Sequence, residues 1–403
     1  MQRSLRENQG AGHGRLPMGL PLFSYGFRPF FLGAGVWAML SLALWLGALA
    51  GVWELAPGYG ALAWHAHEML FGYGSAVVAG FLLTAVPNWT GRLPVAGWRL
   101  LLLFLLWCAA RVAFLVTGAT GSLPAVAIDS LFLPCLLFVL GREIVVARNW
   151  RNLRPLGLVA LLAAADIGFH AEVLSTGTAS AASRVGIAAL IGLIMLIGGR
   201  IVPSFTHTWL LRMRSEHLPV SFGRFDLATL FVSGVALVIW IIGPETDATG
   251  VSFVIAAILQ AVRLWRWAGP YAWREPLVLV LHIGYAFVPL GFLLGGIAVF
   301  EPDALAGTAA MHAWTVGAIG VMTIAVMTRA TRGHTGRELT ASPLTIITYT
   351  TIAVASVLRI AAGAVPQTYV GLIELAGFAW IAAFGLFLIE YAPMLLRARL
   401  ERG

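Results

Sequence analysis

Apolar runs of about 20 residues recur along this chain, and a run of that length and composition crosses the core of a bilayer as a helix. Of the 403 residues, 59% are hydrophobic and only 11% are charged, which excludes a soluble domain of this size. We therefore predict an all-α polytopic membrane protein with about twelve spans. The predicted spans are residues 30–50, 64–86, 100–117, 125–146, 155–174, 183–201, 225–242, 251–265, 277–300, 311–328, 343–362 and 368–395.

Arginine is unevenly distributed among the loops. Arginines precede the first span and follow or flank the even-numbered spans, whereas the other loops carry acidic residues or no charge. Because basic loops stay on the cytoplasmic side, both termini are predicted to be cytoplasmic. The predicted divisions are a cytoplasmic segment 1–29, a single membrane domain 30–396 and a cytoplasmic tail 397–403. The formal charge of +8 then follows from topology and indicates contact with membrane lipid rather than with nucleic acid.

Two further sequence features bear on the organisation of the chain. Residues 1–18 are polar and glycine-rich and lack the apolar run of a signal peptide. No sequence match between the two halves is evident, although six plus six spans would permit an internal repeat.

Ionisable side chains gather where the second span begins, in the sequence Trp-His-Ala-His-Glu-Met at residues 64–69. Such groups are costly at the edge of a bilayer, so they indicate a functional site. On a helix, His65 and His67 lie about 200° apart around the axis, so they cannot easily bind one metal ion. They are better placed to serve two centres on opposite faces, or one metal and one hydrogen-bonded relay. Glu68 lies one turn after His65, where it can orient the ring or accept a proton.

The predicted topology places four histidines near the external face: His65, His67, His170 and His312. An isolated interfacial histidine is more often a hydrogen-bonded or aromatic-belt residue than a ligand. Four imidazoles reaching one level from three helices are more specific, and they predict a metal or haem site at that level.

A second group of candidate ligands lies toward the cytoplasmic side: His207, His282 and His334. His282 falls within a span, whereas His207 and His334 are as well explained as interfacial residues. Arg200 follows two glycines and precedes a proline, which would let a flat group approach the helix closely. A haem propionate or quinone head group is one expectation for Arg200, and lipid phosphate is the other.

Acidic residues within the spans are the candidate proton carriers. Asp166 lies in the middle of the fifth span, one turn before His170, and Glu172 is close by. Either proton transfer or orientation of His170 would explain Asp166, and so would a structural ion pair. Asp129 receives the same two interpretations with less weight on function. Arg111 and Arg359 are the intramembrane arginines that could neutralise Asp166 or a haem propionate.

Several segments resemble the NnrS family over nearly the whole chain. They are residues 24–31, 64–69, 80–91, 198–203, 312–317 and 327–336. The resemblance implies a multi-pass protein of the bacterial inner membrane that contains haem and copper and takes part in nitric oxide metabolism or in protection against nitrosative stress. Five residues in the matching segments carry this expectation: His65, His67, Arg200, His312 and His334.

Three hypotheses follow. The first is a nitric oxide reductase-type oxidoreductase that couples two molecules of nitric oxide to nitrous oxide at haem b with copper or a second haem. In it the four outer histidines are ligands, Glu68 passes protons with Glu172 or Asp166, and quinol donates electrons near His282 or Arg200. The second is a protein that binds nitric oxide without turnover, or that handles haem or copper. The third is a transporter or structural membrane protein with interfacial histidines.

Overall fold

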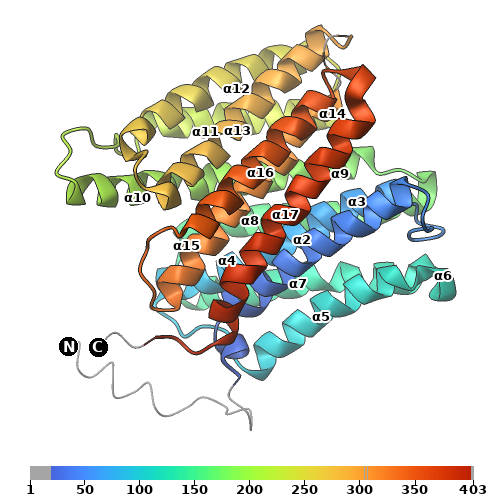
Figure 1. Ribbon diagram of the computed structural model, residues 1–403, viewed down its shortest axis with the longest axis horizontal. Helices are drawn as coiled ribbons and strands as arrows, with labels where there is room; N and C mark the ends of the chain where they lie inside the picture. The colour runs from blue at the N-terminus through green and yellow to red at the C-terminus, as the bar shows by residue number, and fades with distance from the viewer. Residues whose placement is uncertain (1–19, 304, 306, 401–403) are drawn as a thin grey trace.

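The computed structural model describes residues 20–303, 305 and 307–400, so most of the predicted segment 1–29 and part of the tail 397–403 lie outside the described residues. Within the described residues no strand is present, and twelve helical segments are long and apolar enough to cross a membrane. The predicted fold class and number of spans are therefore confirmed. Figure 1 shows the long helices running in one general direction.

The spans have the following bounds in chain order. They are α2 (Phe27–Leu49); α3 (Ala61–His67), η3 (Glu68–Gly74) and α4 (Ser75–Thr90) together; α5 (Trp98–Leu115); α7 (Ser122–Val146); α8 (Leu153–Thr176); α9 (Ser180–Leu193), η5 (Ile194–Gly198) and α10 (Gly199–Arg212) together; α11 (Arg224–Ile242); α12 (Asp247–Trp265); α13 (Pro276–Phe300); α14 (Gly307–His312), η7 (Ala313–Val321) and α15 (Met322–His334) together; α16 (Pro343–Ala362); and α17 (Tyr369–Leu396). The short elements are η2 (Pro21–Ser24), α6 (Thr117–Thr120), η4 (Trp150–Asn152), η6 (Gly269–Ala272) and η8 (Pro366–Thr368).

Several helices continue beyond the predicted apolar runs. The sixth span ends at Arg212 and the tenth at His334, rather than at residues 201 and 328. Helical hydrogen bonding does not stop where the sequence becomes polar, because long arginine side chains at a helix end still reach water. His207 and His334 therefore lie on helices, and the predicted loop position of His334 is wrong.

Spans 2, 6 and 10 each contain a π-helical segment, which is η3, η5 and η7 respectively. The apolar parts of these three spans are 78%, 61% and 67% buried, and span 9 is also 67% buried, which places all four inside the bundle. α9 packs against both η3 and η7, and α4 packs against α15. The three π-bulged spans thus lie at the centre together with span 9, and their spacing of four spans indicates a repeat that the sequence alone did not reveal.

Spans 2 and 10 also resemble each other in sequence. Both carry His-Ala near the beginning and end in Thr-Gly-Arg, at residues 65–66 and 90–92 in one and 312–313 and 335–337 in the other. The glycine of each ending has a positive φ, 69° in one and 81° in the other, a conformation that favours glycine after a helix. These correspondences favour a unit of four spans over the six-plus-six arrangement.

The first and last spans lie side by side, as Figure 1 shows for α2 and α17. Nη1 of Arg28, at the start of α2, donates to the carbonyl oxygens of Leu395 at 2.7 Å and Arg397 at 2.6 Å. These carbonyls stand at the end of α17, where a helix leaves acceptors without partners. The contact joins the two ends of the membrane domain.

Candidate metal centre

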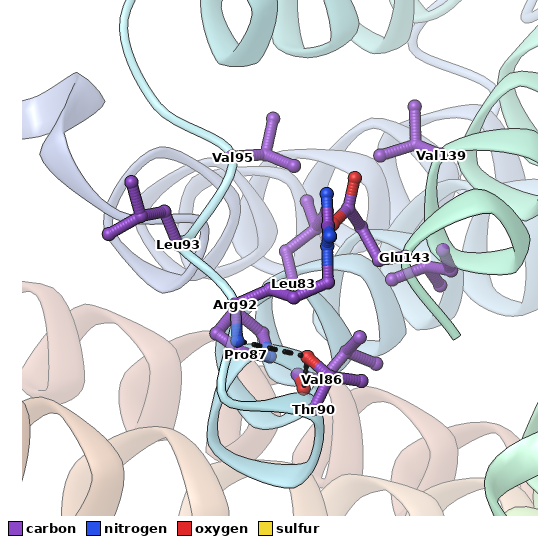
Figure 2. A pocket seen from close by; sticks show the side chains of 10 residues that line it. Leu83, Val86, Pro87, Thr90, Arg92, Leu93, Val95, Val139 and Glu143 are labelled. Carbon is purple, nitrogen blue, oxygen red and sulfur yellow. Dashed lines mark hydrogen bonds and ion pairs between the residues drawn. The ribbon is translucent and has the colours of Figure 1, made fainter. Parts of the chain in front are cut away.

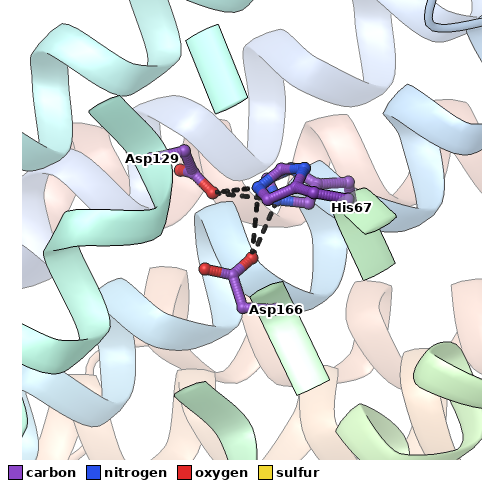
Figure 3. Close-up of side chains that lie close together, drawn as sticks. His67, Asp129 and Asp166 are labelled. Atoms are coloured by element: carbon purple, nitrogen blue, oxygen red, sulfur yellow. Dashed lines mark hydrogen bonds and ion pairs between the residues drawn. The ribbon is translucent and has the colours of Figure 1, made fainter. Parts of the chain in front are cut away.

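Two histidines and two aspartates meet inside the bundle. His67 comes from α3, Asp129 from α7, and both Asp166 and His170 from α8, where they lie one turn apart on the same face. One ligand atom from each residue lies within 4.8 Å of all the others. All four side chains are buried, with His67 fully inaccessible. Figure 3 shows Asp129 and Asp166 directed toward the His67 ring.

Four of the six spacings among these atoms are close to those of ligands around one ion. Nε2 of His67 lies 3.0 Å from Oδ2 of Asp129 and 3.0 Å from Oδ1 of Asp166. Nε2 of His170 lies 3.1 Å and 3.7 Å from the same two oxygens. Tetrahedral bonds of about 2.0–2.1 Å to nitrogen and oxygen place neighbouring ligands about 3.4 Å apart. The donor set therefore fits a single transition-metal ion.

The charges in the cluster also call for a cation. Arg111 pairs with Glu68, at 3.0 Å from Nη1 to Oε2, and with Asp129. With Asp166 included, three carboxylates face one guanidinium, which leaves two negative charges while both imidazoles are neutral. A buried and uncompensated charge is strongly unfavourable. A divalent cation would neutralise the group, and two extra protons are the alternative.

In both cluster histidines, Nδ1, the ring nitrogen that faces away from the aspartates, has a hydrogen-bond partner, as is usual for metal ligands. Nδ1 of His67 lies 3.1 Å from Oε1 of Glu68, whose other oxygen accepts the Trp37 indole N–H at 2.7 Å. Nδ1 of His170 lies 2.9 Å from the hydroxyl of Tyr59. These contacts fix both rings with Nε2 pointing at the aspartates.

Tyr59 reaches the cluster from the loop between the first two spans. It stands between two glycines with positive φ, 77° before it and 92° after it, and its side chain is buried. Burial raises the pKa of the Tyr59 phenol, so the hydroxyl stays protonated at neutral pH. The loop therefore supplies a neutral hydrogen-bonding group to His170.

His65 faces the opposite side of the same helical turn, as its spacing from His67 predicted. Its ring stacks on Trp45 with centroids 4.2 Å apart, and its Nδ1 is buried with no hydrogen-bond partner among the described residues. His312 lies on this side as well, and Arg359 is within electrostatic range of both imidazoles. The four outer histidines thus form two pairs instead of one site.

The His65 side has features that fit a haem. Nδ1 of His312 donates to the Thr308 carbonyl at 2.6 Å, which leaves Nε2 free to bind a metal. Nη1 of Arg359 is buried and has no hydrogen-bond partner among the described residues, so it suits a carboxylate such as a propionate. The donor chemistry on this side is therefore compatible with a haem that His65 or His312 would hold, with Arg359 near a propionate.

Other predicted site residues lie apart from the cluster. Glu172 accepts hydrogen bonds from the backbone amides of Ala181 at 3.2 Å and Ala182 at 3.0 Å, so it caps the first turn of α9. Nε2 of His282 is occupied by the Thr206 hydroxyl at 2.8 Å. The hydrogen bonds of Glu172 and His282 are therefore made within the fold and not to the cluster.

The remaining members of the second group of candidates, and Arg200, are more accessible. Arg200 is exposed and donates to Oδ1 of Asn152 at 3.4 Å, and His207 is exposed. His334 packs on Tyr25 and Phe27, with centroids 5.9 Å and 5.5 Å away.

Sequence reasoning underestimated two residues and missed two. Asp129 received little functional weight, and Arg111, one of two arginines proposed to neutralise Asp166 or a haem propionate, pairs with Glu68 and Asp129. Tyr59 and Trp37 were not identified. Asp129 and Arg111 lie on consecutive spans, so their complementary charges were a detectable signal. Nothing in the sequence indicates that the loop tyrosine turns inward.

A small pocket lies at the other end of span 2 (Figure 2). Its lining is mainly aliphatic, and its two charged side chains, Arg92 and Glu143, form an ion pair with each other. It offers no free ionisable group for chemistry.

Comparison with known proteins gives one family. No match is found among curated proteins. The family model described as NnrS protein matches residues 21–399, which is nearly the whole chain and includes every residue of the cluster. The chain belongs to the NnrS family.

Proposed function

We propose that this protein reduces nitric oxide to nitrous oxide in a bacterial inner membrane, with copper and haem b as cofactors and quinol as electron donor. The balanced reaction consumes two molecules of nitric oxide, two protons and two electrons, and it yields one nitrous oxide and one water. Family membership supports the general assignment, because it makes this a membrane protein related to nitric oxide. The particular reaction rests on the site.

The observation that carries the proposal is the opposite orientation of His65 and His67 on one helical turn. His67 belongs to the buried cluster, and His65 faces Trp45 and His312 on the other side. Two redox centres, bound on opposite faces of one helical turn by His65 and His67, would together supply the two electrons that the reaction requires.

The two sides suit different cofactors. His67, His170, Asp129 and Asp166 would hold copper, while His65 and His312 would hold haem b with Arg359 near a propionate. When bound, these groups supply electron storage and a site for nitric oxide. The chain's own residues fix the ligand rings and exclude water, because the cluster is buried.

Protons would reach the cluster from the external loop. The Tyr59 hydroxyl contacts His170, and Glu68 contacts His67 on the far side of the cluster. Glu68 is the carboxylate outside the donor set that is placed to hold a proton beside the site, whereas Asp166, the other predicted carrier here, would serve as a ligand. Glu172, the other predicted proton carrier, has no place in this route because it caps α9.

One observation favours a second candidate function. The cluster offers four protein ligands, which would be enough to close a metal site, and closed sites are typical of structural rather than catalytic metals. A closed site would suit a protein that binds nitric oxide at haem without turnover, or one that handles haem or copper.

The test is anaerobic nitric oxide consumption by the purified and reduced protein, with nitrous oxide measured by gas chromatography and the absorption spectrum recorded in parallel. We expect many turnovers and one nitrous oxide per two nitric oxide molecules. His67→Ala should abolish turnover while the protein remains inserted in the membrane, and Glu172→Gln should retain it. A nitric oxide-dependent spectral shift without sustained turnover in the wild type would instead establish the second candidate.

A further inference from the structure

The three π-bulged spans line an apolar cavity of about 80 Å³ that is partly open to the outside of the bundle. Span 2 lines it from Gly74 to Leu82, span 6 from Leu190 to Ile201, and span 10 from Ile319 to Val326. Gly74 and Gly198 end the π-helical turns η3 and η5, and both line the cavity. A Cβ at Gly74 would lie 3.3 Å from Leu190 of the facing span, so the missing side chain lets spans 2 and 6 approach closely at the cavity.

The lining offers no free hydrogen-bonding side chain. Thr323 is its one polar side chain, and its hydroxyl donates to the carbonyl of Ile319 at 2.7 Å and contacts the Tyr73 hydroxyl. Apolar cavities of this kind stay dry and admit small apolar molecules such as xenon. The cavity therefore suits a small uncharged molecule and disfavours water and anions.

Phe71 stands between this cavity and the metal cluster. Its ring centroid lies 5.4 Å from that of His67, and it follows His67 by about one turn and precedes Gly74 by another. Gly74 comes seven positions after His67, a distance of roughly 10 Å along the helix axis. On the facing span, a Cβ at Gly186 would lie 2.8 Å from the Phe71 ring. Gly186 is one turn from Leu190 of the cavity lining.

We propose that the cavity holds a small apolar molecule of the size of nitric oxide and delivers it to the His67 and His170 cluster, with the Phe71 ring as the barrier between them. This inference deepens the proposed function and rests on it. Nitric oxide would enter the protein at membrane depth, where apolar molecules concentrate, and would reach the cluster without crossing its polar external side.

The first arm of the test uses xenon alone and needs neither metal nor nitric oxide. The binding of xenon to the purified protein is followed by ¹²⁹Xe NMR in the wild type and in Ile197→Trp, which fills the cavity. Ile389→Trp is the matched control, because Ile389 is 69% exposed on the outside of α17. We expect a bound-xenon signal in the wild type and the control that disappears in Ile197→Trp. Equal signals in all three proteins, or none in the wild type, would overturn the proposal.

The second arm measures the association rate of nitric oxide with the reduced protein by stopped-flow absorption. Filling the cavity with Ile197→Trp should slow association by about tenfold, while Phe71→Leu should accelerate it, with the final spectrum unchanged in both. Unchanged rates in both variants would overturn the delivery role even if xenon binds. If the wild type gave no spectral response to nitric oxide, the proposed function and the delivery role would both fail. The xenon comparison would still decide whether the cavity admits an apolar molecule.

Discussion

Nε2 of His67 lies 3.0 Å from Oδ1 of Asp166, although the two residues are 99 positions apart in the chain. This contact joins the second and fifth spans at the level where Asp129 and His170 also meet. The contact belongs to a connected set of buried polar contacts that also includes Asp129, His170 and Arg111. It defines the centre on which the functional predictions depend.

Replacement of Asp166 by Asn should remove the metal from the cluster. The amide keeps the shape of the side chain but lacks the charge, and it is a poorer ligand than a carboxylate. Loss of an outer-shell partner alone typically costs 10–100-fold in metal affinity, so loss of a ligand should cost at least as much. Mass spectrometry of metal content per protein, after purification from metal-supplemented cells, measures the effect.

The control for Asp166→Asn is Glu172→Gln on the same helix. Its side chain caps α9 and does not touch the cluster, so metal content should remain at the wild-type level. Full metal occupancy in Asp166→Asn would show that Asp166 is not a ligand.

The two histidines of the second span should have separable roles. His67→Ala should lose the cluster metal and keep the haem absorbance, because His65 and His312 lie on the other face of the helix. His65→Ala should lose the haem absorbance and keep the metal. Absorption spectra and metal analysis of the two variants provide the measurement, and loss of both groups in each variant would refute two separate centres.

Much of the architecture could be predicted because bilayer thickness sets a minimum length for each apolar run. The opposite orientation of His65 and His67 was also predictable, since helical geometry alone fixes the angle between residues two positions apart. Depth in the membrane follows from position along a span, which is why the outer histidines were placed at one level.

The division of those four histidines into two pairs could not be predicted in the same way. His170 joins His67, whereas His312 lies on the side of His65, and the difference depends on which spans are neighbours. Neighbour relations arise from packing between distant segments, and hydropathy carries no information about them. Tyr59 was missed for a related reason, because a loop residue has no periodic pattern that indicates its direction.

Tyr59→Phe should weaken metal binding by about 10–100-fold, the usual effect of removing a partner from a metal-bound histidine. The variant leaves Nδ1 of His170 without its 2.9 Å contact and changes nothing else in size. Competition with a chelator of known affinity measures the change. Tyr271→Phe, at an exposed tyrosine stacked on His217, is the control and should bind metal like the wild type.

The Tyr59 effect should be independent of pH in the neutral range. Burial raises the pKa of this phenol above its ordinary value, so the hydroxyl remains protonated there. For a group whose pKa is raised on folding, the contribution to stability is complete below the unfolded pKa of about 10 and is lost only as pH rises through the folded value. A difference between Tyr59→Phe and wild type that changed between about pH 6 and pH 9 would contradict this assignment.

Arg111→Gln should destabilise the protein strongly. It leaves Glu68 and Asp129 buried without their cation, and breaking a buried ion pair on one side typically costs about 3–5 kcal/mol. Thermal unfolding in detergent should show a clearly lower midpoint. Arg142→Gln is the matched control, because Arg142 pairs with Glu143 at a side chain that is 55% exposed, where such pairs contribute about 0–1 kcal/mol. Equal midpoints for the two variants would mean that Arg111 does not balance the cluster's charge.

Gly199→Ala should destabilise the protein even though the same change usually strengthens a helix by about 1 kcal/mol. A Cβ at Gly199 would clash with Nη2 of Arg263, a guanidinium that is fully buried. Arg263 cannot easily move away, because it donates to the Met195 carbonyl at 3.1 Å and the Tyr285 hydroxyl at 2.8 Å. Overpacking of this kind costs about 1–3 kcal/mol.

Gly157→Ala provides the comparison for this last prediction. Gly157 lies within α8, and no atom comes within 4 Å of where its Cβ would be. That variant should therefore gain about 1 kcal/mol from helix propensity alone. Unfolding midpoints measured side by side should shift in opposite directions, downward for Gly199→Ala and upward for Gly157→Ala. An upward shift in both would show that Arg263 is free to yield and does not hold the end of η5 in place.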